Sequence, residues 1–219
     1  MKASILFLIS IVSSQILYGQ VSNYTNVYHF RKYVIDLETP DLKSDIDIEG
    51  TPFLDSTFVE GSFLFGDTVY SLPLRYNVFL EAFEVKLDNE SLYINSNLVD
   101  TIFYKNAYYV FKNEGLKQKV FQVLHRDDQA ELLKKHTVHF IEGSSGVPFK
   151  EDVLPHFKNS IPDYYLFSTT TGLTRIVSFK DFNTIAPDKA EEIEVFIKKN
   201  KLKKKNEADL VKLFRFVVE

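Results

Sequence analysis

The most concentrated group of polar side chains in the aromatic-rich part of the chain is Arg75-Tyr76-Asn77, which follows Pro73. A guanidinium beside a phenol and an amide can bind a carboxylate or a sugar, because Arg presents a planar fork of donors. The same side chains can instead satisfy backbone groups where a strand turns next to a proline. We prefer the structural interpretation, and Arg75, Tyr76 and Asn77 are the weak binding candidates of this sequence.

The five histidines do not predict a metal site. The pair His136 and His139 superficially resembles a metal motif, but on a strand residues i and i+3 point to opposite faces. No Glu lies between the two histidines, so the helical zinc-hydrolase motif is absent as well. The chain has no Cys, which excludes disulfides and thiolate ligands. We therefore expect neither a metal nor another cofactor.

The sequence also lacks a recognisable catalytic constellation. The run Gly143-Ser144-Ser145-Gly146 is one residue too short for the nucleophile-elbow motif of serine hydrolases. Asp127-Asp128 falls in an expected turn, where exposure keeps both carboxylates ionised and unsuited to acid catalysis. Glycines are few and scattered, so no phosphate-cradling loop is expected. We expect a protein that is not an enzyme, and a hydrolase is the third of three hypotheses.

Six lysines near the C-terminus form the strongest charge run of the chain. They could contact anionic lipid headgroups, where each Lys near the surface contributes about 1 kcal/mol. We prefer the interpretation as a solvated helix end, because cations are favourable at a helix C-terminus and the chain as a whole has a net charge of −4. Membrane contact is thus considered but not favoured for Lys198, Lys199, Lys201, Lys203, Lys204 and Lys205.

The first 20 residues differ from everything that follows. Lys2 gives a positive start, residues 3–17 are apolar and almost uncharged, and Gly19 is a small residue near a cleavage site. This pattern predicts a cleaved secretory signal, because the interrupted apolar run is short for a membrane span of about 20 residues. We expect an exported protein, periplasmic or secreted. Without the signal the net charge goes from −4 to about −5, so a nucleic-acid partner is not expected.

Residues 57–178 are expected to form an antiparallel β domain. Aromatic residues make up 15% of the chain, which favours sheet, and short apolar runs alternate with turn residues such as Gly66-Asp67 and Lys105-Asn106. These features predict an α+β fold that is mainly an antiparallel β-meander, as an open sheet or a partly closed barrel. Strands are expected at residues 58–65, 68–74, 83–87, 92–94, 99–104, 107–111, 119–125, 132–141, 164–168 and 173–178.

The segments around and within this domain have other patterns. Residues 21–56 are frequently acidic and only loosely periodic, which predicts a solvated N-terminal arm that can include one edge strand. Residues 142–162 contain three prolines and a Gly-Ser tract, so we expect a long loop there, and such loops are often functional. Residues 179–219 change to a period of about 3.6 and predict three helices that pack on the sheet. Their starts are expected at Ser178, Pro187 and Asn206.

Several short motifs resemble those of a known group of sequences. They are Pro73-Leu74-Arg75-Tyr76-Asn77 before the 83–86 strand, the leucine-rich return 130–136, the Ser-Phe-Lys-Asp-Phe helix start at 178–182, and the lysine-rich 197–203 segment before Asp-Leu-Val-Lys-Leu. In these motifs the chain is similar to a family of uncharacterised, signal-bearing proteins of Bacteroidota-type gram-negative bacteria. The resemblance implies export and a shared fold over most of the exported chain. It implies no activity and no functional residues.

Two non-enzymatic functions are compatible with these patterns. The first is a binding or scaffolding module of the bacterial cell envelope with a protein or envelope partner, which would use the sheet or the 142–162 loop. Tyrosines can supply such a surface, although strand alternation explains them equally well as half-buried packing; they are Tyr104, Tyr108, Tyr109, Tyr164 and Tyr165. The alternative is a carrier of an apolar ligand in a sheet cavity lined by Phe63, Phe65, Phe83 and Phe103.

Overall fold

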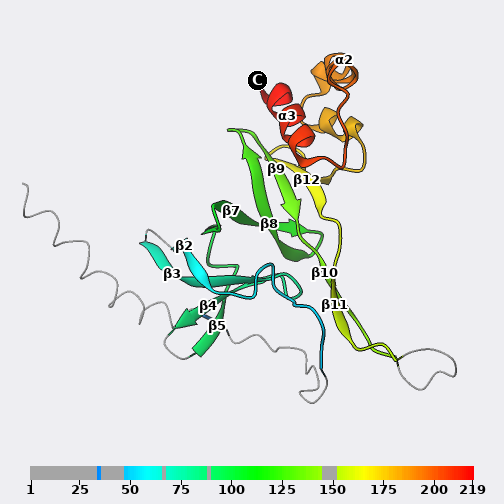
Figure 1. The fold of residues 1–219 in the computed structure, drawn as a ribbon. Coiled ribbons are helices and arrows are strands. Elements are labelled where there is room, and N and C mark those ends of the chain that lie inside the picture. The colour runs from blue at the N-terminus through cyan, green and yellow to red at the C-terminus, as the bar shows by residue number, and fades with distance from the viewer. Residues whose placement is uncertain (1–33, 36–46, 66–67, 88–89, 145–151) are drawn as a thin grey trace, which may run out of the picture.

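The computed structural model describes residues 34–35, 47–65, 68–87, 90–144 and 152–219 (Figure 1). The predicted signal at 1–20, most of the N-terminal arm and the Gly66-Asp67 turn lie outside these residues. The strands are β1 (Val34–Ile35), β2 (Val59–Phe65), β3 (Thr68–Asn77), β4 (Ala82–Leu87), β5 (Glu90–Ile94), β6 (Thr101–Tyr104), β7 (Ala107–Glu114), β8 (Lys117–Arg126), β9 (Ala130–Lys135), β10 (Val138–Ile141), β11 (His156–Asn159), β12 (Asp163–Ser168) and β13 (Gly172–Arg175). The helices are η2 (Phe179–Thr184), η3 (Pro187–Lys189), α2 (Ala190–Asn200) and α3 (Glu207–Val218).

Eleven of these strands form one open antiparallel sheet in the order β1-β5-β4-β3-β2-β6-β7-β8-β9-β12-β13. Most neighbours in the sheet are also neighbours in sequence, as expected for hairpins with short turns. Lys105 and Asn106 both have positive φ, which is the conformation of a type I′ hairpin turn between β6 and β7. The predicted fold class, a mainly antiparallel β-meander followed by C-terminal helices, is confirmed, and of the two forms that the sequence allowed, the sheet is the open one.

The sheet bends so that its first half packs against its middle. An aromatic core lies between the two parts, with Tyr76, Phe83, Tyr104 and Tyr109 almost fully buried. The second half curls as well, because β13 lies near β7 as well as beside β12. Its inner face buries a small separate cluster of Val110, Phe121, Leu133 and Tyr165.

Strand β8 contains a bulge that interrupts the regular alternation of its side chains. The register with β9 shifts between Val123 and His125, so one residue of β8 is left over at this point. As a result Leu124 and His125 both reach the helices: Leu124 packs in their core and the His125 ring meets the Phe214 ring edge-on at 5.7 Å. In a regular strand these two neighbouring side chains would point to opposite faces, and the bulge removes that alternation here.

The region from 132 to 162 is also organised differently from the prediction. The expected strand 132–141 is split into β9 and β10, and the expected loop contains β11. Strands β10 and β11 pair with each other in a second sheet, and the pairing extends to a bridge between Ser144 and Val153. We call this unit the β10–β11 hairpin. Three prolines concealed it in the sequence, but the described ones, Pro155 and Pro162, flank β11 rather than interrupt it.

The C-terminal helices begin where the sequence predicted helix starts. Ser178 and Asp181 form the capping box, although the element that follows is a 3-10 helix. Pro187 opens the short η3, which leads directly into α2, and the Asn206 side chain caps α3 by accepting from Asp209 N at 3.2 Å. Helix α3 packs on β8 and β9, as Figure 1 shows at the end of the sheet. Its predicted apolar face is buried in full: Leu210, Leu213, Phe214 and Val217.

Candidate functional site

Arg75, Tyr76 and Asn77 do not share one site: strand alternation places Tyr76 on the opposite face of β3 from the other two, and Arg75 and Asn77 have separate partners. Arg75 makes a two-point ion pair with Glu84 of β4, through Nε–Oε2 at 2.5 Å and Nη2–Oε1 at 3.0 Å. Its guanidinium also lies over the rings of Phe53 and Phe58, at 3.8 and 4.4 Å. These contacts attach the 53–58 segment to β3 and leave the guanidinium fork occupied within the fold.

Tyr76 and Asn77 have other roles in the fold. The Tyr76 ring is stacked on Phe83 at 4.8 Å in the aromatic core, and burial raises the pKa of its phenol. The Asn77 side chain accepts a hydrogen bond from Leu80 N at 3.0 Å and so supports the β3–β4 turn. Each of the three side chains has a packing or hydrogen-bonding role, and together they form no open binding surface.

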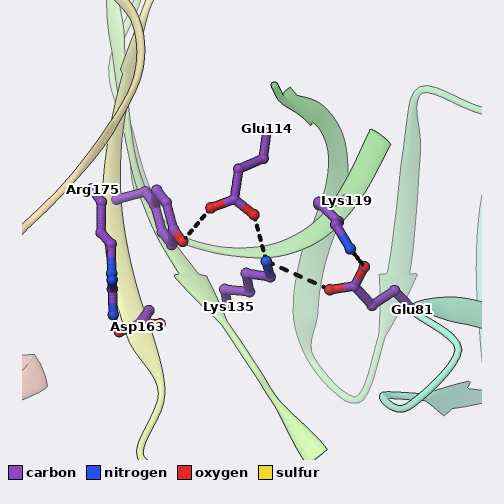
Figure 2. Close-up of polar contacts among 7 residues, drawn as sticks. Glu81, Glu114, Lys119, Lys135, Asp163 and Arg175 are labelled. Atoms are coloured by element: carbon purple, nitrogen blue, oxygen red, sulfur yellow. Dashed lines mark hydrogen bonds and ion pairs between the residues drawn. The ribbon is translucent and has the colours of Figure 1, made fainter. Parts of the chain in front are cut away.

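A network of charged groups links several elements at the C-terminal end of β9, where Lys135 lies (Figure 2). Lys135 Nζ lies 2.5 Å from Glu114 Oε2 and 3.6 Å from Glu81 Oε1, and Glu81 also pairs with Lys119. The Tyr165 hydroxyl donates to Glu114 Oε1 at 2.6 Å. These bonds connect β7, β8, β9 and β12 with the turn between β3 and β4.

In this network each charged side chain is paired with one of opposite charge. Burial opposes ionisation of Glu114, but the hydrogen bonds from Lys135 and Tyr165 outweigh it and lower the pKa of the carboxyl. Burial and the nearby Glu114 raise the pKa of Tyr165. The Lys135 amine is held between two carboxylates and is not free to meet a substrate, so it suits neither nucleophilic nor base chemistry. The network therefore holds β7, β8, β9 and β12 in place against the β3–β4 turn.

The other candidate groups are separate in the structure. His136 lies beside Gln122, whereas His139 is exposed on β10. Among the described residues, His, Asp and Glu form no group of three or more that could hold a metal ion. Asp127 lies in the β8–β9 turn, where its carboxylate accepts from Gln129 N.

The lysine run surrounds the turn between α2 and α3. All six lysines are exposed. Lys198 pairs loosely with Glu194 at 3.6 Å, and Lys204 Nζ donates to the Val177 carbonyl at 2.5 Å. In the described part of the chain no helix is long and apolar enough to cross a membrane.

The aromatic surfaces proposed from the sequence are divided between faces. Tyr104, Tyr109 and Tyr165 are buried, Tyr164 is half-buried, and Tyr108 is 55% exposed. Phe63 and Phe83 belong to the filled aromatic core, with Phe65 packed at its side. Phe103 pairs with Ser62, the neighbour of Phe63, and therefore lies on the opposite face of the sheet. The four phenylalanines do not line one cavity.

The β10–β11 hairpin is the most prominent projection from the sheet. It runs away from the sheet on the side opposite the C-terminal helices (Figure 1). Large apolar side chains are exposed along it and on the adjoining segment that leads to β12. They are Ile141, Val153, Leu154 and Ile161, the last 76% exposed.

The base of the hairpin is fastened to the rest of the fold by backbone and aromatic contacts. Glu49 N donates to the Pro155 carbonyl at 3.0 Å, and Phe157 N donates to the Glu49 carbonyl at 2.9 Å, so the 49–50 segment lies alongside β11. Gly50 has a φ of +79°, and a side chain there would meet the Phe157 carbonyl. The Phe157 ring contacts Phe140 and Phe79. These contacts hold β11 at Pro155 to Phe157 against the rest of the fold, while Ile141, Val153 and Leu154 remain exposed.

Sequence reasoning did not identify this hairpin or the residues that hold it. Its only signal was the length and composition of 142–162, which were interpreted as a loop. Glu81, Lys119 and Lys135 are far apart in sequence and carry no motif that would group them. Comparisons with protein-family models, curated proteins and solved structures found no match.

Proposed function

We propose that the protein is a non-enzymatic binding or scaffolding module of the bacterial cell envelope, and that it engages a protein partner through the β10–β11 hairpin. One observation carries this proposal. The hairpin is fixed at its base yet exposes Ile141, Val153 and Leu154, by 40 to 48%. Exposed apolar side chains on a projecting element are a feature of interaction sites.

The pairing of the basic side chains elsewhere in the fold supports the same function. Arg75, Lys119 and Lys135 are occupied by carboxylates within the fold. A binding protein needs a rigid base more than it needs free reactive groups. The apolar-carrier alternative has less support, because Phe63 and Phe103 lie on opposite faces of an open sheet. Export, which the pattern at 1–20 predicts, would place the hairpin in the envelope.

Site-specific photo-crosslinking in envelope extract tests the proposal. A photoreactive residue is placed at Ile141 or at Leu154, and a matched one at Leu116, which is fully exposed in the β7–β8 turn. We expect one discrete protein adduct from both hairpin positions and none from Leu116. The variant Leu154→Ser should weaken the adduct formed at Ile141 without lowering stability by more than about 0.5 kcal/mol, as for a surface substitution.

Two results would contradict the proposal. Equal crosslinking from Leu116 would show that capture is unspecific. The second result would come from native mass spectrometry of the purified mature protein. A lipid or small molecule that co-purifies without a protein partner would favour the apolar-carrier alternative.

A further inference from the structure

The chain passes from the main sheet to the β10–β11 hairpin at two residues. Lys135 makes the last pair with β12, opposite Asp163, and Val138 makes the first pair with β11. His136 and Thr137, between them, belong to no strand. We call residues 135–137 the root of the hairpin. A change in the angle of the hairpin relative to the sheet must involve this root, together with the return segment 160–162 and the contacts of Glu49 and Phe79 with β11.

Neighbouring side chains of the root are held on opposite faces. Lys135 is bound by Glu81 and Glu114, as described above. His136 Nε2 lies 2.8 Å from Gln122 Oε1, and its ring meets the Tyr76 ring edge-on at 6.5 Å. The neutral Nε2–H tautomer donates to Gln122, which satisfies the nitrogen in a partly buried position.

A second proton on His136 would be costly in this position. The ring is partly buried against the Tyr76 ring, and the cation that disfavours its protonation is Lys134, two residues earlier in β9. Lys134 is itself paired with Glu207 at 2.8 Å. Glu207 therefore stabilises a His136 cation less than an unpaired carboxylate would. Burial, helped by Lys134 and opposed by Glu207, lowers the pKa of His136 from 6.5 to about 4.

No carboxylate among the described residues is in direct contact with His136 to stabilise its cation. The titratable groups on the elements packed around it are Lys134 and Lys135 on β9, Lys119 on β8, Tyr76 on β3, Tyr109 on β7, Glu81 in the β3–β4 turn and Glu207 on α3. Glu81 is bound by Lys119 and Lys135, and Glu207 by Lys134. The cation therefore gains most by moving into water.

We infer that His136 is an acid-sensitive latch, which holds the root of the β10–β11 hairpin while neutral and releases it when protonated. The inference rests on the proposed function for its biological meaning, since release would change how the hairpin is presented to a partner. The physical event does not need the partner. It is a local opening in which the His136 ring leaves Tyr76 and Gln122 and takes Thr137 with it.

The sign of the pH effect follows from proton uptake. A histidine in the opened root takes up a proton below its ordinary pKa of about 6.5, whereas the packed ring remains neutral down to about pH 4. Opening is therefore favoured as the pH falls through this window. Each pH unit raises the opening constant by up to about tenfold. Between pH 6.5 and 4.5 the expected increase is at most about a hundredfold.

Native-state hydrogen exchange of the mature protein, corrected for intrinsic exchange rates, tests the latch without any partner. We expect protection of β10 and β11 amides to fall between pH 6.5 and 4.5, while amides of β3 and β4 change little. The variant His136→Gln keeps a donor for Gln122 but cannot be protonated, so its hairpin should lose the pH slope. His139→Gln, on the exposed part of the same hairpin, should retain the wild-type slope.

Two outcomes would overturn the latch. One is a wild-type hairpin whose protection is flat across this range. The other is a His136→Gln variant with an undiminished slope, whatever its absolute protection. Because exchange is measured on the free protein, failure of the latch is distinguishable from failure of the crosslinking experiment, which tests the partner alone.

Discussion

The molecule has two large hydrophobic cores that differ in side-chain composition. The aromatic core of the sheet contains Tyr76, Tyr104 and Tyr109, each at most 2% exposed, and the hydroxyls of Tyr76 and Tyr104 have no hydrogen-bond partner among the described residues. The helical core joins β9 and β12 to the C-terminal helices and is aliphatic apart from phenylalanine at its centre, where Phe182 and Phe214 are fully buried. Tyrosines are among the fully buried side chains of the aromatic core, whereas the fully buried side chains of the helical core are all apolar.

The difference reflects how each core is assembled. Rings in the aromatic core come from several strands. Tyr76 and Phe83 are a direct cross-strand pair, whereas Tyr76 of β3 meets Tyr109 of β7 because the sheet bends. Side chains in the helical core come from β9, β12 and the helices, where Ser178 and Asn206 cap η2 and α3. The helical core should therefore be the more sensitive to lost volume, and the aromatic core the more sensitive to changes in polar groups.

The largest expected effect is in the helical core. Phe214→Ala should lower the free energy of unfolding by about 3 to 5 kcal/mol, because it removes a fully buried ring and leaves a cavity between α3 and the sheet. The matched control is Val195→Ala on α2, where the side chain is 63% exposed and the change should stay within about 0.5 kcal/mol. Urea denaturation measures both. A loss below about 1 kcal/mol for Phe214→Ala would mean that the helices contribute little to the fold.

A smaller but still large effect is expected beside the aromatic core, at Arg75. Arg75→Ala leaves Glu84, only 4% exposed, as a buried carboxylate without its partner, and should cost about 3 kcal/mol. Arg175→Ala is the control, because its pair with Asp163 is exposed on both sides and should contribute at most about 1 kcal/mol. Equal losses in the two variants, by thermal or urea unfolding, would contradict the structural role of Arg75.

The two cores also differ in how far the sequence could predict them. The face of α3 followed from the spacing of Leu210, Leu213, Phe214 and Val217, since a helix repeats every 3.6 residues within one segment. The strands of the meander were predicted for the same local reason. The bend that brings Tyr76 to Tyr109, the bulge after Val123 and the pairing of Glu81 with Lys135 depend on residues distant in sequence. No local period encodes them.

The candidate site shows the same limit. Residues 142–162 were singled out for their length, but prolines concealed β11, and the sequence offered no reason to connect His136 with Gln122 or Tyr76. Arg75, Tyr76 and Asn77 were adjacent in sequence and were grouped for that reason. Strand alternation then separated Arg75 from Tyr76. Proximity in sequence was a poor guide to a site on a strand.

The smallest effect tests the polar atoms of the aromatic core directly. Tyr76→Phe removes a buried hydroxyl that has no partner, so stability should be unchanged or should rise by up to about 1 kcal/mol. Tyr165→Phe removes a hydroxyl that donates to Glu114 at 2.6 Å, and should lower stability by about 1.5 kcal/mol. Both changes keep the ring, so urea unfolding compares the hydroxyls alone. A clear loss of stability in Tyr76→Phe would mean that its hydroxyl is bonded in solution, for which an enclosed water is the simplest partner. The aromatic core would then be a hydrated core, and its contrast with the helical core would lie in the water it holds.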